Sequence, residues 1–435
     1  MTGPLWVALP GGWLVGQVKN AATVTLGKML QSKDSGSDVC APYLRAANVQ
    51  PDGVLVLDDV NEMWFGDEEL EKLSIRAGDV VVVEGGQGGF GRAAYVDEDL
   101  PGWGFQNSIN RLRPTGDFDG RFIAFYLIAL RASGFIRAYC NVVSMPHLTA
   151  EKLARIPMPL PSLEEQRAIA DHLDRETARI DTLIEEQQRL IELLHERRNA
   201  VIVGVTTKGV IPEKALIQSG NGPLWVALPG GWLVGQVKNA ATVTLGKMLQ
   251  SKDSGSDVCA PYLRAANVQP DGVLVLDDVN EMWFGDEELE KLSIRAGDVV
   301  VVEGGQGGFG RAAYVDEDLP GWGFQNSINR LRPTGDFDGR FIAFYLIALR
   351  ASGFIRAYCN VVSMPHLTAE KLARIPMPLP SLEEQRAIAD HLDRETARID
   401  TLIEEQQRFI ELARERRSAL ITAAVTGQTY VLESA

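Results

Sequence analysis

The chain has 435 residues, of which 45% are hydrophobic, a formal net charge of −15 and four cysteines. This length accommodates at least two domains. The sequence has no run of eighteen apolar residues and no signal-peptide pattern, so we expect a cytoplasmic protein without a membrane partner. The cysteines are Cys40, Cys140, Cys259 and Cys359, and their isolated positions lack the spacing of a zinc site, so no metal is expected.

The negative charge is concentrated in one stretch of each half. Taken alone, a net charge of −15 disfavours nucleic acid as a partner, because phosphate contacts need lysine and arginine. Residues 52–71, however, contain eight carboxylates and no basic residue. The acidity is therefore local, and the rest of the surface is free to present basic groups to DNA.

The sequence consists of one unit written twice. Gly3–Arg189 recurs without a substitution as Gly222–Arg408, and the copies diverge only afterwards. A period of this length indicates a domain duplication rather than a solenoid repeat.

The first part of each unit has a mixed pattern. Short apolar runs at 54–57 and 80–83 are separated by Asp, Gly and Pro, which predicts strands and turns. One helix is predicted at about 117–139. Three prolines between 157 and 161 then predict an extended lead-out segment.

The glycine-rich stretch GQGGFG at 86–91 matches a dinucleotide-binding pattern by its letters alone. Such a site needs a helix directly after the glycines, because the pyrophosphate binds at that helix N-terminus. Here RAAYVDEDLP follows, which favours a short strand and then a turn. We therefore predict a β-hairpin with a glycine tip, and a dinucleotide enzyme is the least favoured alternative.

A long helix is predicted from 162 to 202, and its repeat from 381 to 424. Ser162 and Glu165 form a capping-box pattern at its start. Apolar residues then recur at steps of about four and three, which is typical of a coiled-coil seam. We expect the two helices to pair in antiparallel orientation; packing of each helix on its own globular part is the alternative. The predicted seam comprises Ile169, Leu173, Ile180, Leu183, Leu190 and Leu194, with Ile388, Leu392, Ile399, Leu402 and Phe409 in the second helix.

Several segments resemble the specificity subunits of type I restriction-modification systems. They are SMPHLTAEKLARIPMPLPSLEEQRAIADHLDRETARIDTLIEEQ at 144–187, PYLRAANVQPDGVLVLD at 42–58, LSIRAGDVVVVEGGQGGFGRAAYV at 73–96, QNSINRLRPT at 106–115 and ITAAVTGQ at 421–428. The resemblance covers nearly the whole chain and follows the family's order of recognition domain, helix, recognition domain, helix.

The resemblance implies an α+β protein in which two mixed α/β target-recognition domains are joined by two long helices that form an antiparallel coiled coil with pseudo-two-fold symmetry. The expected divisions are recognition domain 1 at 1–161, spacer helix 1 at 162–208, a linker at 209–222, recognition domain 2 at 223–380, spacer helix 2 at 381–427 and a tail at 428–435.

The resemblance also implies a non-catalytic DNA reader. Its partners would be double-stranded DNA, two modification subunits that methylate adenine N6, and restriction subunits. The chain itself would hold no cofactor, whereas S-adenosylmethionine and ATP with magnesium would bind the partner subunits. The sequence departs from the family pattern in one respect, because its two recognition domains are identical. Identical readers related by a two-fold axis would read an interrupted palindrome.

Polar residues on predicted loops are the candidate DNA contacts, since base edges are read by Arg, Lys, Asn and Gln. In the first copy they are Lys28, Lys33, Arg45, Asn48, Gln87, Arg92, Gln106, Asn107 and Ser108, and in the second Lys247, Lys252, Arg264, Asn267, Gln306, Arg311, Gln325, Asn326 and Ser327. The main alternative is a coiled-coil scaffold that carries two ligand-binding modules and has no DNA role.

Overall fold

A computed structural model describes residues 3–86, 89–140, 147–210, 214–218, 222–305, 308–359 and 366–429. The chain divides into two compact units, one formed by Met1–Gln188 with Arg408–Ala435 and the other by Arg189–Gln407. Within the described ranges, no helix is long and apolar enough to cross a membrane.

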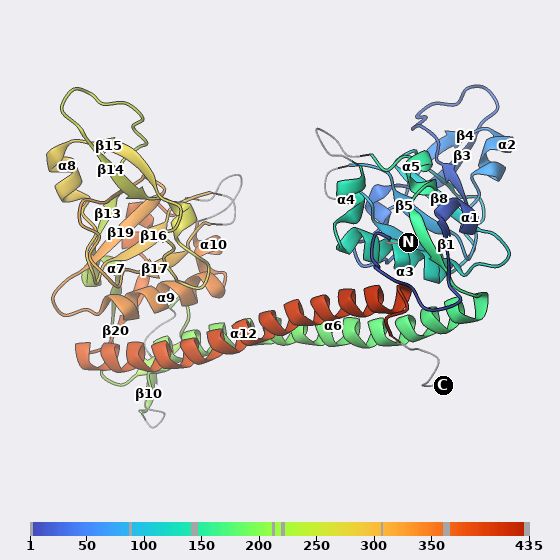
Figure 1. The fold of residues 1–435 in the computed structure, drawn as a ribbon. Coiled ribbons are helices and arrows are strands. Elements are labelled where there is room, and N and C mark those ends of the chain that lie inside the picture. The colour runs from blue at the N-terminus through green and yellow to red at the C-terminus, as the bar shows by residue number, and fades with distance from the viewer. Residues whose placement is uncertain are drawn as a thin grey trace. The chain divides into compact units, whose positions relative to one another are not determined.

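Each unit contains one mixed domain, built from the residues that precede a long helix (Figure 1). In the first unit its elements are β1 (Leu14–Gln17), α1 (Val18–Ala21), β2 (Ala22–Leu26), β3 (Val39–Leu44), η1 (Ala46–Asn48), β4 (Asn61–Phe65), α2 (Asp67–Lys72), β5 (Val80–Val83), β6 (Ala93–Tyr95), β7 (Gly104–Phe105), β8 (Ile109–Pro114), α3 (Gly120–Ala132), α4 (Phe135–Tyr139), α5 (Ala150–Ala154) and β9 (Pro157–Leu160).

The second unit repeats these elements and adds a two-stranded sheet of β10 (Leu216–Gln218) and β11 (Ala227–Pro229). Its remaining elements are β12 (Leu233–Gln236), α7 (Val237–Ala240), β13 (Ala241–Leu245), β14 (Val258–Leu263), η2 (Ala265–Asn267), β15 (Asn280–Phe284), α8 (Asp286–Lys291), β16 (Val299–Val302), β17 (Ala312–Tyr314), β18 (Gly323–Phe324), β19 (Ile328–Pro333), α9 (Gly339–Ala351), α10 (Phe354–Tyr358), α11 (Ala369–Ala373) and β20 (Pro376–Leu379).

Two sheets form the centre of the mixed domain. One has the strand order β2-β8-β5-β6 and is antiparallel throughout; the other has the order β4-β3-β7, with β3 and β7 parallel. In the first unit, α3 lies near the long helices, whereas β3, β4 and α2 lie on the far side of the domain from them (Figure 1).

The run VVVV of β5 is buried on both faces, which explains why its sequence shows no polar alternation. Val80 and Val82 pack in the core shared with α3, whereas Val81 and Val83 pack in the core between the two sheets. Successive side chains of a strand point to opposite faces, so this one strand joins the two cores.

Two predicted elements of the mixed domain differ from the structure. The helix expected at 117–139 is divided into α3 and α4, because Gly134 adopts a left-handed φ of 78° that ends the first helix. The run at 54–57 is not a strand; only Leu55 forms a bridge, to Val49. The run at 80–83 is confirmed as β5.

The long helices are α6 (Leu163–Lys208) and α12 (Leu382–Val425). The capping box at the start of α6 is confirmed, because the Ser162 backbone amide donates to the Glu165 carboxylate at 2.9 Å and the Glu165 amide donates to the Ser162 hydroxyl at 3.3 Å. This exchange satisfies two backbone donors that an open helix end would leave unpaired.

The helices run antiparallel within each unit. In the first unit Asp181 pairs with Arg417, while Ile169, earlier on α6, shares a core with Val425, later on α12. In the second unit Leu194 packs with Ile399 and Ile403, while Ile202, later on α6, shares a core with Ile388, earlier on α12. In both units, moving forward along one helix corresponds to moving backward along the other.

Buried seam residues recur at steps of three and four residues, but not through all the predicted positions. Leu183, Leu190, Leu402 and Phe409 are exposed, and Ile184, Ile403 and Ile410 are buried instead. A step of one residue turns the side chain by roughly 100° around the helix, so two adjacent apolar residues cannot both face the partner. Buried positions of the seam also include Thr177, Thr396 and Arg198, which are polar and lie outside the predicted apolar set.

An ion pair in the protein interior holds the segment between α2 and β5. Asp79 is 1% exposed, and both of its carboxylate oxygens accept from Arg113, at 2.8 and 2.7 Å. Arg111 lies beside it over the Phe105 ring, and burial together with the neighbouring Arg113 lowers the pKa of Arg111 to about 10. The twin residues Asp298 and Arg332 repeat the pair.

Replacing Asp79 by Ala should destabilise the first domain by about 3–5 kcal/mol, because a buried pair that loses one partner leaves an uncompensated charge. Calorimetry of the full chain should show one domain transition shifted to lower temperature and the transition of the second domain retained. Glu151→Ala is the matched control, since its ion pair with Arg155 is exposed and should contribute at most about 1 kcal/mol. If the Asp79 and Glu151 variants shift the transition of the first domain equally, the buried ion pair of Asp79 does not stabilise the domain as predicted.

Candidate nucleic-acid interface

Four loop segments of the mixed domain converge at one edge of its sheets. Lys28 bridges to Gln106, and the Asn107 amide donates to the Lys28 carbonyl at 2.7 Å. The Ser108 hydroxyl accepts from the Ala46 amide at 3.3 Å. These hydrogen bonds join the loop 27–38, the start of η1 and the segment 106–108.

The glycine segment is held at the same edge. The Glu84 amide donates to the Ser108 carbonyl at 2.8 Å. β5 and β6 then form the predicted antiparallel hairpin, and the described residues after Gly91 continue into β6 rather than into a helix. Gly91 has a φ of 71° and an added Cβ would meet Ile136 at 3.0 Å, so the turn requires glycine. The arrangement differs from a dinucleotide site, whose glycines lead into a helix.

Several of the predicted cations have partners inside the domain. Lys28 forms an ion pair with Glu69 and lies over the Phe65 ring, and Arg45 pairs with the exposed Asp59. Lys33, by contrast, is exposed. Lys247, Arg264 and Lys252 repeat these positions in the second unit.

Arg92 is half-buried and donates to the Val49 carbonyl at 3.3 Å, as Arg311 does to Val268 at 3.2 Å. Gln106 accepts from the Ser108 hydroxyl at 3.2 Å, and Gln325 from Ser327 at 3.3 Å. Asn107 and Asn326 are half-buried on the same segment.

Asn48 and its twin Asn267, two of the predicted DNA contacts, are buried. Both are 3% exposed. The Asn48 amide donates to the carbonyls of Val56 and Asp59 and accepts from the Arg45 amide, so it closes a turn inside the domain. Gln87 and Gln306, also predicted as contacts, lie outside the described residues.

Glu84 is an acidic residue of this edge that the sequence did not single out. Its side chain is 13% exposed, and its Oε2 atom has no hydrogen-bond partner among the described residues. His147 lies 4.0 Å from the other carboxylate oxygen. Burial raises the pKa of Glu84 despite the opposing effect of His147, and the pKa of Glu303 is raised for the same reason.

The mixed domain is mounted on α6 through residues at the start of α3. Gln166 is fully buried and accepts from the Asp119 amide at 3.0 Å. Arg121, in the first turn of α3, donates to Asp171 at 2.7 Å and to Asp174 at 2.8 Å. Charge-assisted bonds of this kind fix orientation as well as attachment.

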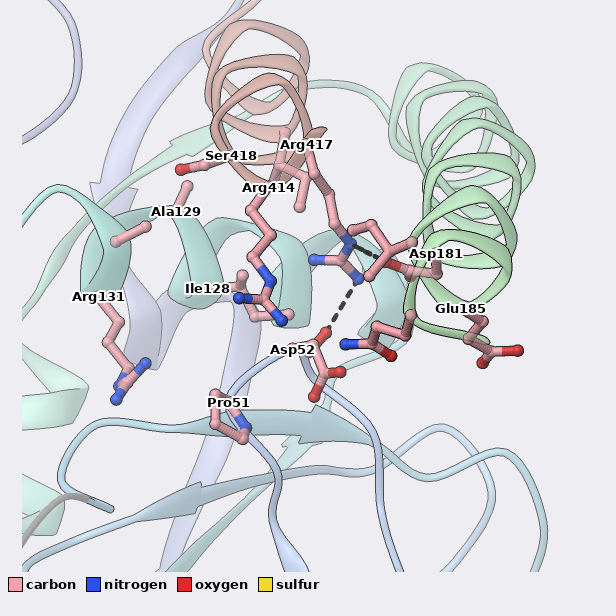
Figure 2. A pocket seen from close by; sticks show the side chains of 14 residues that line it. Pro51, Asp52, Ile128, Ala129, Arg131, Asp181, Glu185, Arg414, Arg417 and Ser418 are labelled. Carbon is pink, nitrogen blue, oxygen red and sulfur yellow. Dashed lines mark hydrogen bonds and ion pairs between the residues drawn. The ribbon is translucent and has the colours of Figure 1, made fainter. Parts of the chain in front are cut away.

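A cavity of about 650 Å³ lies between the mixed domain and the long helices of the first unit (Figure 2). Ile128 and Asp52 line the domain side, and Asp181, Arg414 and Arg417 line the helix side. Arg417 spans the cavity edge to reach both Asp181 and Asp52.

Comparison with known proteins gives the family. The model of the type I restriction modification DNA specificity domain matches residues 10–193 and again residues 229–412. The chain belongs to this family. The two mixed domains are its target-recognition domains.

Individual members of the family are distant relatives of this chain. The type I restriction enzyme MjaVIII specificity subunit of Methanocaldococcus jannaschii is 25% identical over 315 residues, which cover 71% of this chain and 70% of that protein. The putative MjaX specificity subunit of the same organism is 23% identical, over 97% of this chain and 95% of the relative.

Solved structures share the fold. A chain from a study of complex assembly and conformational transition of the type I R-M system has a TM-score of 0.74 at 17% identity, covering 97% of this chain and all of that one. The HsdS subunit from Thermoanaerobacter tengcongensis has a TM-score of 0.53 at 18% identity, covering 99% of this chain.

The residues that attach the recognition domains to the long helices were not predicted from the sequence. Arg121 and Gln166 lie on helices, whereas the predicted polar contacts are all on predicted loops. Arg198 and Arg417 follow the seam rhythm, seven residues after Ile191 and Ile410. An arginine at a seam position, bordered by apolar residues three or four positions away, was the available signal.

Glu84→Gln should stabilise the first recognition domain at neutral pH. A carboxyl whose pKa is higher in the folded state than in the unfolded state binds protons preferentially in the folded state, so its contribution to stability falls as pH rises between the two values. The substitution removes this penalty. Thermal melts should show a gain at pH 7 that disappears near pH 4, below the usual glutamate pKa of about 4.3. A gain that is independent of pH would contradict the titration and point to packing.

Proposed function

We propose that this chain is the DNA-specificity subunit of a type I restriction-modification complex, and that it reads a bipartite DNA site without catalysing a reaction itself. The observation that carries the proposal is the presence of two target-recognition domains, each mounted on antiparallel helix segments, in a chain of the specificity family. The edge formed by loop 27–38, Arg45, Arg92 and the segment 106–108 is the proposed DNA-facing surface.

The two half-sites should have the same sequence in inverted orientation. The recognition domains are identical in sequence, so each reads the same bases. The helices run antiparallel within each unit, which supports a two-fold relation between the domains rather than a translation. Two-fold related readers bind a palindrome, and in a bipartite site a spacer interrupts it.

Exposed apolar residues on the helices support docking of two modification subunits. The first unit exposes Leu183, Phe409 and Leu412, and the second exposes their counterparts Leu402, Leu190 and Leu193. Apolar groups repeated on a solvent-facing helix stripe are typical of a surface that another protein covers. S-adenosylmethionine would bind those partners, ATP with magnesium would bind the restriction subunits, and this chain would carry no cofactor.

Methylome sequencing of cells that express the chain with its cognate modification subunit tests the proposal. We expect N6-methyladenine at one interrupted palindrome. An asymmetric or directly repeated motif would keep the specificity role and exclude the two-fold relation. Absence of new methylation, while the modification subunit is active with a different specificity subunit, would exclude the proposed function and favour the scaffold alternative.

The double variant Leu193→Ser/Leu412→Ser should weaken binding of the modification subunit. These side chains are 60% and 55% exposed, so their loss should leave the thermal transition of the free chain unchanged while it removes apolar contact area from the interface. The loss of affinity should be at least about tenfold in a titration of the purified subunits.

Val54→Ser/Val273→Ser is the control, because both valines are 50% exposed but lie on the recognition domains. If the leucine pair and the valine pair bind the modification subunit equally well, the helix stripe is not the docking surface.

A further inference from the structure

Arg417 joins three parts of the first unit. Its Nε lies 2.9 Å from Oδ1 of Asp181 on α6, and its Nη2 donates to the backbone carbonyl of Asp52 at 3.1 Å. Figure 2 shows the guanidinium between the helix pair and the domain loop. One side chain of α12 thus contacts both the other long helix and the recognition domain.

Arg198 makes the same contacts in the second unit. Its Nε lies 2.9 Å from Oδ1 of Asp400, and its Nη2 donates to the Asp271 carbonyl at 2.9 Å. Arg198 is 6% exposed. The contact set, called here the arginine clamp, therefore occurs once in each unit.

Each clamp arginine belongs to the helix of the other repeat. Arg417 follows the second recognition domain in the chain but contacts the first, and Arg198 follows the first but contacts the second. The helix that directly follows a domain supplies a different anchor, through Arg121 with Asp171 and Asp174 in the first unit. Each domain is therefore held at two points by two different helices.

The two anchors are separated along α6. Asp181 lies seven residues after Asp174, which corresponds to about 10 Å of helix. The cavity of about 650 Å³ lies beside the clamp, so the domain is not closely packed against the helices there. Apolar contacts of Ile421 and Val425 also attach the domain, but such contacts are non-directional. A rigid angle requires the second directional anchor.

The clamp contributes more to orientation than to stability. Burial raises the pKa of Asp181 although Arg417 favours its ionised form, so removal from water outweighs the attraction. An ion pair in this situation adds little net stability, whereas its geometry remains specific. Loss of both charges together should leave the fold intact.

The clamp also contacts the loop that leads to the DNA-facing edge. Asp52 lies in the turn after η1, and Val49 in that segment accepts from Arg92 at 3.3 Å. Arg92 directly precedes β6, the second strand of the glycine hairpin. A fixed clamp thus fixes the direction in which this edge points.

We propose that Arg198 and Arg417 are positioning residues that set the angle of each recognition domain on its helix segments, and thereby restrict the number of base pairs between the two half-sites. This inference rests on the proposed function. The half-site bases are read elsewhere, so the clamp should govern the spacer and leave the half-site sequence unchanged.

The test compares the full chain with its Arg198→Gln/Arg417→Gln variant, each with the cognate modification subunit, by methylome sequencing. The expected result is unchanged half-sites with a relaxed spacer. Discrimination against spacers one base pair longer or shorter should fall by roughly tenfold, as for loss of a charge-assisted hydrogen bond. Duplexes that differ only in spacer length should show the same change in a binding titration.

Two further variants make the result specific. Arg179→Gln/Arg398→Gln removes arginines from the same helices, and the Arg179 pair with Glu176 is exposed, so its spacer preference should match the original chain. Asp181→Asn/Asp400→Asn removes the ion pairs but keeps the backbone bonds, and should give an intermediate relaxation. This asparagine variant also tests the inference if the Arg198→Gln/Arg417→Gln variant does not assemble.

The outcomes separate the inference from the proposed function. No methylation by the original chain would exclude the proposed function itself. A discrete spacer that is unchanged in both clamp variants would overturn only the inference. Altered half-site bases with an unchanged spacer would also overturn it, because the clamp would then act in base reading.

Discussion

The antiparallel pairing of the two long helices within each unit is the constraint on which the other features depend. Because the helices run antiparallel within each unit, the end of each helix meets the domain that belongs to the other repeat. Neither repeat therefore contains both of the helix segments that hold its own recognition domain. The core of the first unit includes Ile421 and Val425 from the last turns of the second repeat, so folding of each domain is coupled to a segment far away in the chain.

Much of this fold could be predicted from sequence, because local signals and global packing agree. The capping box at Ser162 marks the start of α6, and the run at 80–83 marks a strand buried on both faces. The predictions were wrong at positions where two neighbouring residues, or two backbone conformations, fitted the local sequence pattern about equally well. Leu183 and Ile184 are both apolar, and the direction of the partner helix decided that Ile184 is buried. Gly134 looked compatible with a continuing helix until its left-handed conformation was known.

The candidate site was less predictable, because exposure and pairing are decided by tertiary contacts. Asn48 and Lys33 are both polar loop residues, yet one closes a buried turn and the other is exposed. Nothing in the local sequence separates these roles. The loop 27–38 and the segment 106–108, both chosen by residue type, are brought together by backbone hydrogen bonds of the Lys28 peptide unit. Residue type therefore selects segments that lie together in the fold, whereas the burial and pairing of each side chain are decided by tertiary contacts.

The differences between the two repeats decide whether the two recognition domains can be attached to their helices in the same way. The recognition domains are identical, and the differences begin on the helix ends that mount them, where His195 corresponds to Arg414 and Asn199 to Ser418. In the first unit, Arg414 and Ser418 line the cavity rather than forming the clamp. The clamp residues Arg198 and Arg417 are the same, and their contacts have closely similar lengths. Two of the differences between the repeats, Arg414 and Ser418, therefore lie in the open space beside the clamp, and the clamp arginine itself is the same in both repeats.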